Sequence, residues 1–355
     1  FEQRAAMGLR QTFPQRTHVG SPRFSWHFRH QKLMAALPAN TAFRFFGGGK
    51  SADYGCITLS EIQGFIDIAG FAYTSQWGSK PTQDLAQLTT YFKKRQKPVI
   101  LLPQAFGPFE TPEIRSAVKE VIGNASLIFA RDEESYNHLQ QLSPTSNSIR
   151  QAPDITLFYP KEPILKASRK TSTVGIVPNA RMLDQGKALW GDNYYDVLVA
   201  INAYLRRSNI AVEILVHDAS GQDMELAQEI RKRTGLPQLP IFSASDPIAI
   251  KQRISEYHLI IGSRYHSLVA ALSTTVPVIA LGWAHKYALL MEEFGLSRFL
   301  LLPGVSIEDA VGHVDHLVQK DVNEVCRKQI SSNLAHMSAA NQEMWDSVAG
   351  VLTAT

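Results

Sequence analysis

The amino-acid sequence predicts an α/β protein made of two Rossmann-like domains that face a cleft. Short apolar segments alternate with amphipathic helical segments along most of the chain, as in parallel sheets that carry helices on both faces. A polar stretch with prolines, Tyr159–Thr171, interrupts this alternation, which then begins again. From Val322 onward the pattern is helical and lacks another strand. We therefore expect an N-terminal domain over 1–165, a C-terminal domain over 166–325, and a helix over 326–355 that packs back on the first domain.

The first half of the chain carries alternating strand and helix signals. The predicted strands are 65–71, 98–103, 126–130 and 148–152, and the predicted helices between them are 83–94, 112–122 and 132–142. A helical pattern over Glu2–Phe13 precedes them. The segment Gly47–Ser51 is interpreted as a flexible turn, because it lacks the spacing of a phosphate-binding loop.

The second half repeats the alternation and ends it in a β-α-β unit. The predicted strands are 173–177, 211–216 and 239–242, and the predicted helices are 194–207, 222–234 and 247–256. The final unit consists of strand 258–262, the turn Ser263–His266, a helix of small residues over 267–274, and strand 278–281. The crossover of this unit is expected to be right-handed. Because the turn follows the end of a strand, it lies at the carboxyl edge of the sheet, where helix N-termini and backbone N–H groups bind anions. An anion there would meet Arg264, the helix dipole and His266 together.

Composition favours an enzyme that handles small anions. The chain has 36 basic and 32 acidic residues, a net charge of +4. It lacks the stripe of Lys and Arg interleaved with aromatics that is typical of nucleic-acid binding, so no nucleic-acid partner is expected. No apolar run approaches the ~20 residues of a transmembrane helix. The two cysteines, Cys56 and Cys326, match no metal or disulfide framework. The first residue is Phe1, which is compatible with a native N-terminus and a targeting segment upstream of it.

A second arginine lies at a strand end in the first domain. Arg131 follows the apolar strand and precedes Asp132, a candidate helix N-cap. If the domains face each other, Arg131 and Arg264 approach one ligand from opposite sides, and their planar guanidinium groups match phosphate and carboxylate groups. The alternative for Arg131 is an ion pair with Asp132 or Glu134.

Further polar side chains follow strands of the second domain. His285 and Lys286 come after strand 278–281, and Lys286 is either a point charge for a phosphate group or a solvated surface lysine. Asn179 and Arg181 come after strand 173–177 and either contact the ligand or shape the loop. At the end of strand 211–216, the pair His217 and Asp218 has no third ligand with suitable spacing, so no metal is expected.

Aromatic residues follow the first predicted strand. Tyr73 and Trp77 suit stacking on a pyranose ring, as Tyr and Trp commonly do. Core packing is the competing interpretation and is favoured for Trp77. Gln104 and the turn at Gly107–Pro108 end the next strand, where they are expected to shape the cleft.

Several motifs, in order along the chain, resemble those of the polysaccharide pyruvyl transferase family. The segments that carry the resemblance are Phe65–Tyr73 with Gln76–Gly78, Leu102–Phe109, Ala130–Tyr136, Val174–Met182, the turn Gly262–His266, and Gly282–Tyr287. Together they cover roughly residues 45 to 300. The resemblance implies the two-domain arrangement called GT-B among glycosyltransferases.

The resemblance also implies an activity. Such an enzyme transfers pyruvate from phosphoenolpyruvate to a hexose of a polysaccharide, an oligosaccharide or a lipid-linked precursor, as a cyclic ketal. His266 would be the general acid, and the donor would be bound by Arg131, Arg264, Tyr265, Lys286 and Asn179. Tyr73, Trp77 and Gln104 would lie on the acceptor side. No cofactor or metal is expected, because two arginines and a helix terminus can neutralise the leaving phosphate.

Two alternatives stay open at this point. One is a glycosyltransferase that uses a nucleotide sugar on the same two-domain frame. The other is a non-catalytic carbohydrate-binding protein, against which the set of Arg131, Arg264 and His266 argues. The Gly282–Tyr287 segment is similar to one in a bacterial branch of the family, which favours a cytoplasmic enzyme of envelope-polysaccharide assembly. The lumen of the secretory pathway is the alternative location.

Overall fold

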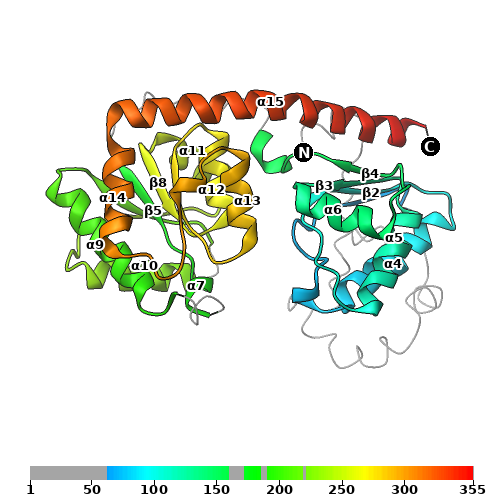
Figure 1. Cartoon of the computed structure of the whole chain (residues 1–355), viewed down its shortest axis with the longest axis horizontal. Coiled ribbons are helices and arrows are strands. Elements are labelled where there is room, and N and C mark those ends of the chain that lie inside the picture. Colours follow the sequence, from blue (N-terminus) through cyan, green and yellow to red (C-terminus); the bar gives the residue numbers. More distant parts are fainter. Residues whose placement is uncertain (1–61, 160–171, 185–189, 219–220, 355) are drawn as a thin grey trace, which may run out of the picture.

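The computed structural model describes residues 62–159, 172–184, 190–218 and 221–354. They form two α/β lobes, each built around one parallel sheet, and a long C-terminal helix joins the lobes along one side (Figure 1). The predicted fold class of two Rossmann-like domains is confirmed. The predictions for Glu2–Phe13, Gly47–Ser51, Cys56 and the domain boundary at 165/166 lie outside the described residues.

The N-terminal lobe contains a four-stranded sheet in the order β1-β2-β3-β4. Its strands are β1 (Phe65–Asp67), β2 (Val99–Gln104), β3 (Leu127–Ala130) and β4 (Ile149–Gln151), all parallel. The helices are α4 (Lys80–Lys93), α5 (Pro112–Asn124) and α6 (Glu133–Leu142). Every residue of β2 and β3 is buried, as expected for strands that are covered on both faces.

Local capping places the polar residues of this lobe at one edge of the sheet. The side chain of Asp132 accepts a hydrogen bond from the Ser135 N–H and thereby starts α6 directly after β3. Arg131 is therefore held at the carboxyl end of β3. The first strand is shorter than predicted, because the chain leaves the sheet after Asp67 and continues through a loop to the 3₁₀ helix η3 (Ser75–Trp77).

The C-terminal lobe contains a six-stranded parallel sheet in the order β10-β9-β8-β5-β6-β7. The strands are β5 (Val174–Val177), β6 (Val212–Val216), β7 (Ile241–Ser243), β8 (Leu259–Gly262), β9 (Val278–Leu281) and β10 (Leu300–Leu301). Along the chain, β6 and β7 are added on one side of β5, and β8, β9 and β10 are then added on its other side. The reversal lies between β5 and β8, and a sheet of this kind opens a ligand-binding crevice at that switch point.

Helices cover both faces of the second sheet. They are α7 (Arg181–Asp184), α9 (Asn193–Arg207), α10 (Gln222–Arg233), α11 (Pro247–Glu256), α12 (Tyr265–Ser273), α13 (His285–Glu293) and α14 (Ile307–Val318). Helix α12 begins at Tyr265, earlier than predicted, with Arg264 at its N-cap position. Arg264, Tyr265 and His266 therefore form the N-terminus of this helix.

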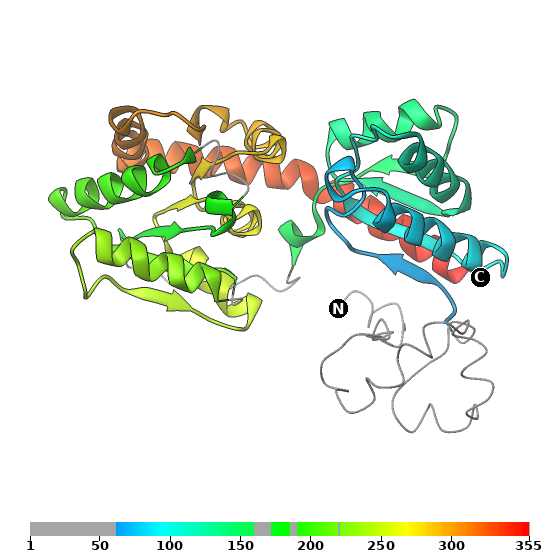
Figure 2. The same ribbon diagram turned by 90° about the horizontal axis from the view of Figure 1, so that it is seen from below.

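The last helix, α15 (Lys320–Thr353), packs on both lobes. Near its start Arg327 donates hydrogen bonds to the backbone carbonyls of Tyr257, His258 and Thr275 in the C-terminal lobe. Near its end the buried side chains of Met344 and Val348 pack in one apolar cluster with residues of β2 and β3. Figure 2 shows the helix crossing both lobes. Within the described residues, no helix combines the length and the apolar character needed to cross a lipid bilayer.

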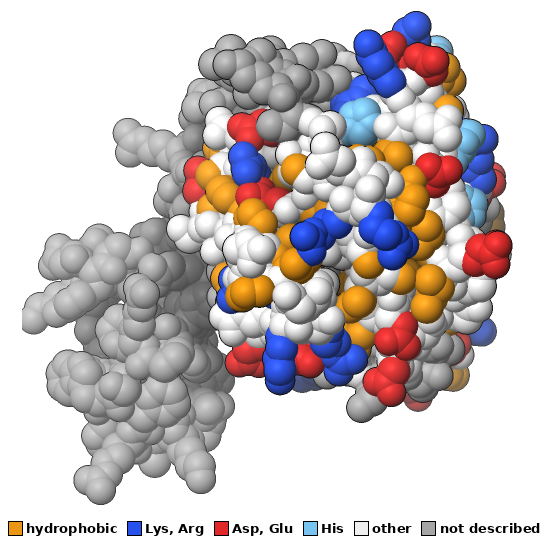
Figure 3. Space-filling model, turned by 90° about the vertical axis from the view of Figure 1, so that its left-hand side faces the viewer, with side chains coloured by type: hydrophobic (Ala, Val, Ile, Leu, Met, Phe, Trp, Pro, Cys, Tyr) orange, Lys and Arg blue, Asp and Glu red, His pale blue; other side chains and the backbone are white. Residues whose placement is uncertain are grey.

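The surface of the C-terminal lobe has mixed character at its outer end. Figure 3 faces the end that carries α9 and α14, and it shows Lys and Arg side chains interspersed with acidic and hydrophobic ones. On this face the basic surplus of the chain is therefore distributed among single residues and small groups.

We expect the substitution Val348→Ala to destabilise the fold. Val348 has no exposed surface, and the loss of two buried methyl groups should lower the free energy of unfolding by about 1.5–2.5 kcal/mol. The matched control is Val325→Ala on the same helix, where the side chain is 65% exposed and the expected change is within about 0.5 kcal/mol. Urea unfolding followed by circular dichroism measures both. Equal losses in the two variants would contradict the packing of α15 on the first sheet.

Candidate active site

A cavity of about 630 Å³ lies at the carboxyl edge of the second sheet, where this edge faces the loop between β1 and α4. Phe71, Gln76 and Trp77 line it from the N-terminal lobe. The C-terminal lobe contributes side chains at the ends of five strands and at the N-terminus of α12, among them Asn179, Arg181, His217, Asp218, Arg264, Tyr265, His266 and Lys286. The cavity therefore lies at the switch point of the sheet and between the lobes.

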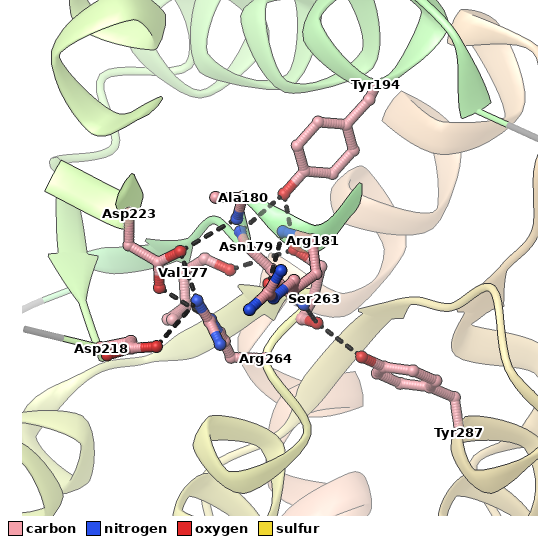
Figure 4. A network of polar contacts seen from close by, with 10 residues as sticks. All are labelled: Val177, Asn179, Ala180, Arg181, Tyr194, Asp218, Asp223, Ser263, Arg264 and Tyr287. Atoms are coloured by element: carbon pink, nitrogen blue, oxygen red, sulfur yellow. Dashed lines mark hydrogen bonds and ion pairs between the residues drawn. The ribbon is translucent and has the colours of Figure 1, made fainter. Parts of the chain in front are cut away.

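Arg264 is held in place by a buried carboxylate. Its Nε and Nη2 atoms donate to the two carboxylate oxygens of Asp223 at 2.7 and 2.6 Å, and Asp223 has no exposed surface (Figure 4). Nη2 also lies 3.2 Å from Oδ2 of Asp218. One edge of the guanidinium group is thus occupied by protein. The Nη1 group makes no hydrogen bond within the described residues, and it is the part of Arg264 that remains for a ligand.

A buried hydrogen-bond network supports the turn before Arg264. The Ser263 carbonyl accepts hydrogen bonds from Asn179 Nδ2 at 2.9 Å and from the Tyr287 hydroxyl at 2.7 Å, and the Ser263 hydroxyl lies 2.5 Å from that of Tyr194 (Figure 4). Asn179 also accepts the N–H of Arg181 at 3.0 Å. Asn179 is 5% exposed, and these contacts engage both ends of its amide. Its evident effect is to position the turn.

His266 is accessible to solvent within the cleft. It lies in the first turn of α12 and makes no hydrogen bond to a described residue, so it does not act as a cap of the helix. Its ring meets that of Tyr265 edge to face at 5.6 Å. Surrounding protein displaces bulk water and lowers the pKa of His266, Asp154 raises it, and the charges of Arg131 and Lys286 lower it further.

Lys286 lies among aromatic rings. Its Nζ is 5.3 Å from the ring centroids of Phe71 and Tyr265 and 5.6 Å from that of Tyr287. Burial, together with the charges of Arg131 and Arg264, lowers the pKa of Lys286 to about 8. These surroundings differ from those of a solvated surface lysine, which was the alternative interpretation.

Arg131 belongs to the N-terminal lobe and lies near the cavity, but it does not line the cavity. Its guanidinium carbon lies 4.7 Å from the ring centroid of Tyr265, and its side chain is 4% exposed. Nη1 is 3.6 Å from Oδ2 of Asp154, and Nε is 3.7 Å from Oδ2 of Asp132 without a hydrogen bond. The ring of Tyr265 covers the guanidinium group. We expected Arg131 to contact the ligand directly. In this structure Tyr265 covers Arg131. Arg131 affects the cavity through its charge, which lowers the pKa of His266 and Lys286.

Glu134, the other expected partner of Arg131, pairs with His285 instead. The contact joins Glu134 Oε2 and His285 Nδ1 at 2.5 Å, and it links α6 of one lobe to α13 of the other. Both side chains are exposed. His285 therefore belongs to the junction of the lobes and is not among the residues that line the cavity.

The predicted acceptor residues separate into two groups. Tyr73 is 8% exposed and stacks on Phe106 at 6.4 Å, and Gln104 has no exposed surface and donates to Asp67 at 2.9 Å. The structure does not bring either of these two side chains to the cavity, because both complete the core of the first lobe. Trp77 is 44% exposed and lines the cavity, so the core-packing interpretation that we favoured for it does not hold.

Three residues of the site were not identified from the sequence as functional. Asp223 and Tyr194 lie inside the amphipathic helices α10 and α9, where no local signal separates them from ordinary helix residues. His217 could have been found from its position directly after β6, but we considered it only as a metal ligand. Within the described ranges, no cluster of three or more His, Cys, Asp or Glu side chains has the arrangement to hold a metal ion.

The sequence matches the family model described as polysaccharide pyruvyl transferase over residues 19–285. The chain therefore belongs to the polysaccharide pyruvyl transferase family, a family of transferases that act on polysaccharides.

Two solved structures show the same fold at low sequence identity. An S. aureus MnaA structure with UDP has a TM-score of 0.52 and 14% identity, covering 77% of this chain and 71% of that one. A Listeria monocytogenes structure assigned as a UDP-N-acetylglucosamine 2-epimerase has a TM-score of 0.51 and 13% identity, covering 76% of this chain and 68% of that one. The likeness shows a GT-B-like arrangement of two Rossmann-like domains.

We expect Asp223→Asn to destabilise the protein, because it leaves the partly buried charge of Arg264 without its main partner. The expected loss is about 2–4 kcal/mol, at the lower end for buried pairs since Arg264 keeps some solvent contact. Asp218→Asn is the control, because Asp218 also contacts Arg264 but is 41% exposed, and its loss should stay below about 1 kcal/mol. Chemical unfolding of both variants tests this. Equal effects would show that Asp223 does not anchor Arg264.

Proposed function

We propose that this chain transfers pyruvate from phosphoenolpyruvate to a hexose of a polysaccharide or of its precursor, as a cyclic ketal. The observation that carries the proposal is the position of His266. Its imidazole is accessible and makes no hydrogen bond to a described residue. It lines the same cavity as the cations Arg264 and Lys286, at the N-terminus of α12.

Positive charge in the cavity supports binding of a donor with two anionic groups. Arg264 presents its Nη1 group, Lys286 presents an ammonium group, and α12 presents the partial positive charge of its N-terminus. Arg131 adds its charge from behind Tyr265. Burial lowers the pKa of Lys286 most, and repulsion from Arg131 and Arg264 lowers it further. A bound phosphate and carboxylate would relieve this repulsion, and the relief favours a multiply charged anion over a neutral sugar.

His266 has the chemistry of the required acid. Protonation of C3 of the enol ether makes C2 electrophilic, so that a sugar hydroxyl can add there, and a second hydroxyl then replaces the phosphate group. In the free protein the lowered pKa of His266 keeps the imidazole mostly neutral. A bound donor carries negative charge and raises this pKa, so His266 would gain its proton when the donor arrives.

The cavity has room for an acceptor beside the donor. Its volume of about 630 Å³ lies within the range for sites that hold a drug-sized ligand, and phosphoenolpyruvate is much smaller than that. Trp77 and Gln76 line it from the N-terminal lobe. A half-exposed indole with a polar neighbour suits stacking on a pyranose ring, and we assign the acceptor to this side of the cavity.

The test is a ketal-forming assay with phosphoenolpyruvate and a panel of methyl hexopyranosides whose hydroxyl groups are free. The wild-type chain should release inorganic phosphate and form a pyruvate ketal. His266→Gln should lower kcat by about 10²–10⁴-fold because the acid is lost, whereas phosphoenolpyruvate should still raise the melting temperature. His336→Ala, on the exposed side of α15, is the control and should keep wild-type activity. Stabilisation by UDP-glucose and not by phosphoenolpyruvate would overturn the proposal in favour of a glycosyltransferase.

The pH dependence of kcat/KM for phosphoenolpyruvate follows from the two lowered pKa values. His266 must carry its proton, so kcat/KM should fall as the pH rises through a midpoint below the ordinary histidine value of ~6.5. Lys286 loses its charge above its pKa of about 8, which should cause a second fall. In Lys286→Arg the second fall should disappear, because arginine stays charged. A kcat/KM that rises as the pH passes through the ordinary histidine value of ~6.5 would exclude His266 as the acid.

A further inference from the structure

A second imidazole, that of His217, lines the same cavity as His266. It follows β6 directly, and β6 is hydrogen-bonded to β5 beside the switch point of the sheet. The side chain is half-buried, and neither ring nitrogen makes a hydrogen bond with the described part of the chain. A structural histidine in such a position normally donates to or accepts from a protein group. The ring nitrogens of His217 are therefore available to a ligand.

The surroundings of His217 keep it neutral. The charged and titratable groups that act on it are His266 and Arg264 from α12, and Asp218 and Asp223 after β6 and in α10. Burial is the largest influence, the two basic groups add to it, and the two carboxylates oppose it, which together bring the pKa of His217 to about 4. The carboxylates are themselves engaged by Arg264, at 2.6 Å for Asp223 and 3.2 Å for Asp218. At neutral pH His217 thus offers an unprotonated nitrogen.

The surroundings of both imidazoles lower the pKa, but the charged groups beside them differ. Burial lowers the pKa of His266, Asp154 opposes this lowering, and a bound anion would oppose it further. His217 is less exposed than His266, and Arg264 and His266 add to the lowering of its pKa. Pairs of titratable groups whose surroundings differ in this way commonly divide the roles of acid and base.

We propose that His217 is the base of the reaction and accepts the proton of the sugar hydroxyl that attacks C2 of the donor. The proposal rests on the function proposed above and assigns the second proton-transfer group of the same site.

The two histidines together balance the protons of the reaction. His266 donates a proton to C3 as the first hydroxyl oxygen bonds to C2, and His217 takes the proton of that hydroxyl. The bond between C2 and the phosphate oxygen then breaks, and protonated His217 donates its proton to the departing phosphate. The second hydroxyl bonds to C2 and returns a proton to His266. Both imidazoles end as they began, and the products are the ketal and inorganic phosphate.

A weakly basic imidazole is suited to this role. A hydroxyl oxygen that bonds to an electrophilic C2 becomes strongly acidic, so its proton moves even to a weak base late in the addition. The protonated form of a weak base is in turn a strong acid, which helps the phosphate group to leave. A more basic group beside Arg264 would hold the proton and slow this second transfer.

The experiment compares His217→Ala and His217→Asn with the wild-type chain in the ketal-forming assay with methyl hexopyranosides. Both variants should keep the rise in melting temperature with phosphoenolpyruvate and lose about 10²-fold or more in kcat with little change in KM for the donor. Added imidazole should raise the kcat of His217→Ala at least about tenfold, because it can occupy the space of the deleted ring. His336→Ala, at an exposed position of α15 that does not line the cavity, is the control and should behave as the wild type.

The outcomes separate the two proposals. If the wild-type chain forms ketal and both His217 variants are equally fast, the role of His217 is excluded while the proposed function stands. Loss of activity together with loss of donor binding, and without rescue by imidazole, would make His217 a structural residue. If the wild-type chain forms no ketal with any hexoside, the reaction itself is absent and the assignment of His217 falls with it. His217→Asn keeps the comparison valid should His217→Ala fail to fold.

Discussion

The site depends on the ion pair between Asp223 and Arg264. Asp223 has no exposed surface, and its two oxygens accept from two nitrogens of Arg264 and from the backbone N–H of Ala180. One carboxylate thereby fixes α10, the loop after β5 and the N-terminus of α12 relative to one another. A charge without exposed surface is stable only when it is paired and hydrogen-bonded, so the carboxylate and the guanidinium group hold each other in one orientation. This pair therefore fixes the positions of the free Nη1 group of Arg264 and of the ring of His266.

The electrostatics of the cavity follow from burial of like charges. Arg131, Arg264 and Lys286 lie close enough to affect the pKa values of their neighbours, and burial prevents water from screening them. In the absence of a ligand this arrangement is unfavourable, which is visible in the pKa of about 8 of Lys286. For the proposed function, such a site would be organised for an anion before the anion binds, and preorganisation of this kind is a main source of transition-state stabilisation.

The two lobes are held together at the side of the cavity and along the back of the molecule. Tyr265 of α12 lies over Arg131 of the first lobe, and the exposed pair Glu134–His285 is close by. On the far side, α15 packs on both sheets through Ile330 and Val348, which have no exposed surface. The helix resists separation of the lobes by burying apolar surface, whereas the exposed ion pair contributes little. The relative position of Arg131 and His266 therefore depends mainly on α15.

The sequence by itself determined the alternation of strands and helices and the turn that carries Arg264 and His266, because these depend on local periodicity and on residues that are adjacent in the chain. It did not show the short strand β10 or the early end of β1, since segments of two or three residues carry no periodic signal. Only the tertiary structure decided which polar residues meet. Asp223 and Arg264 are far apart in sequence, Tyr265 covers Arg131, and Tyr73 and Gln104 belong to the core while Trp77 does not. Burial and the approach of charges that are distant in the sequence are properties of packing. They give His217 and His266, which have the same intrinsic pKa, different surroundings.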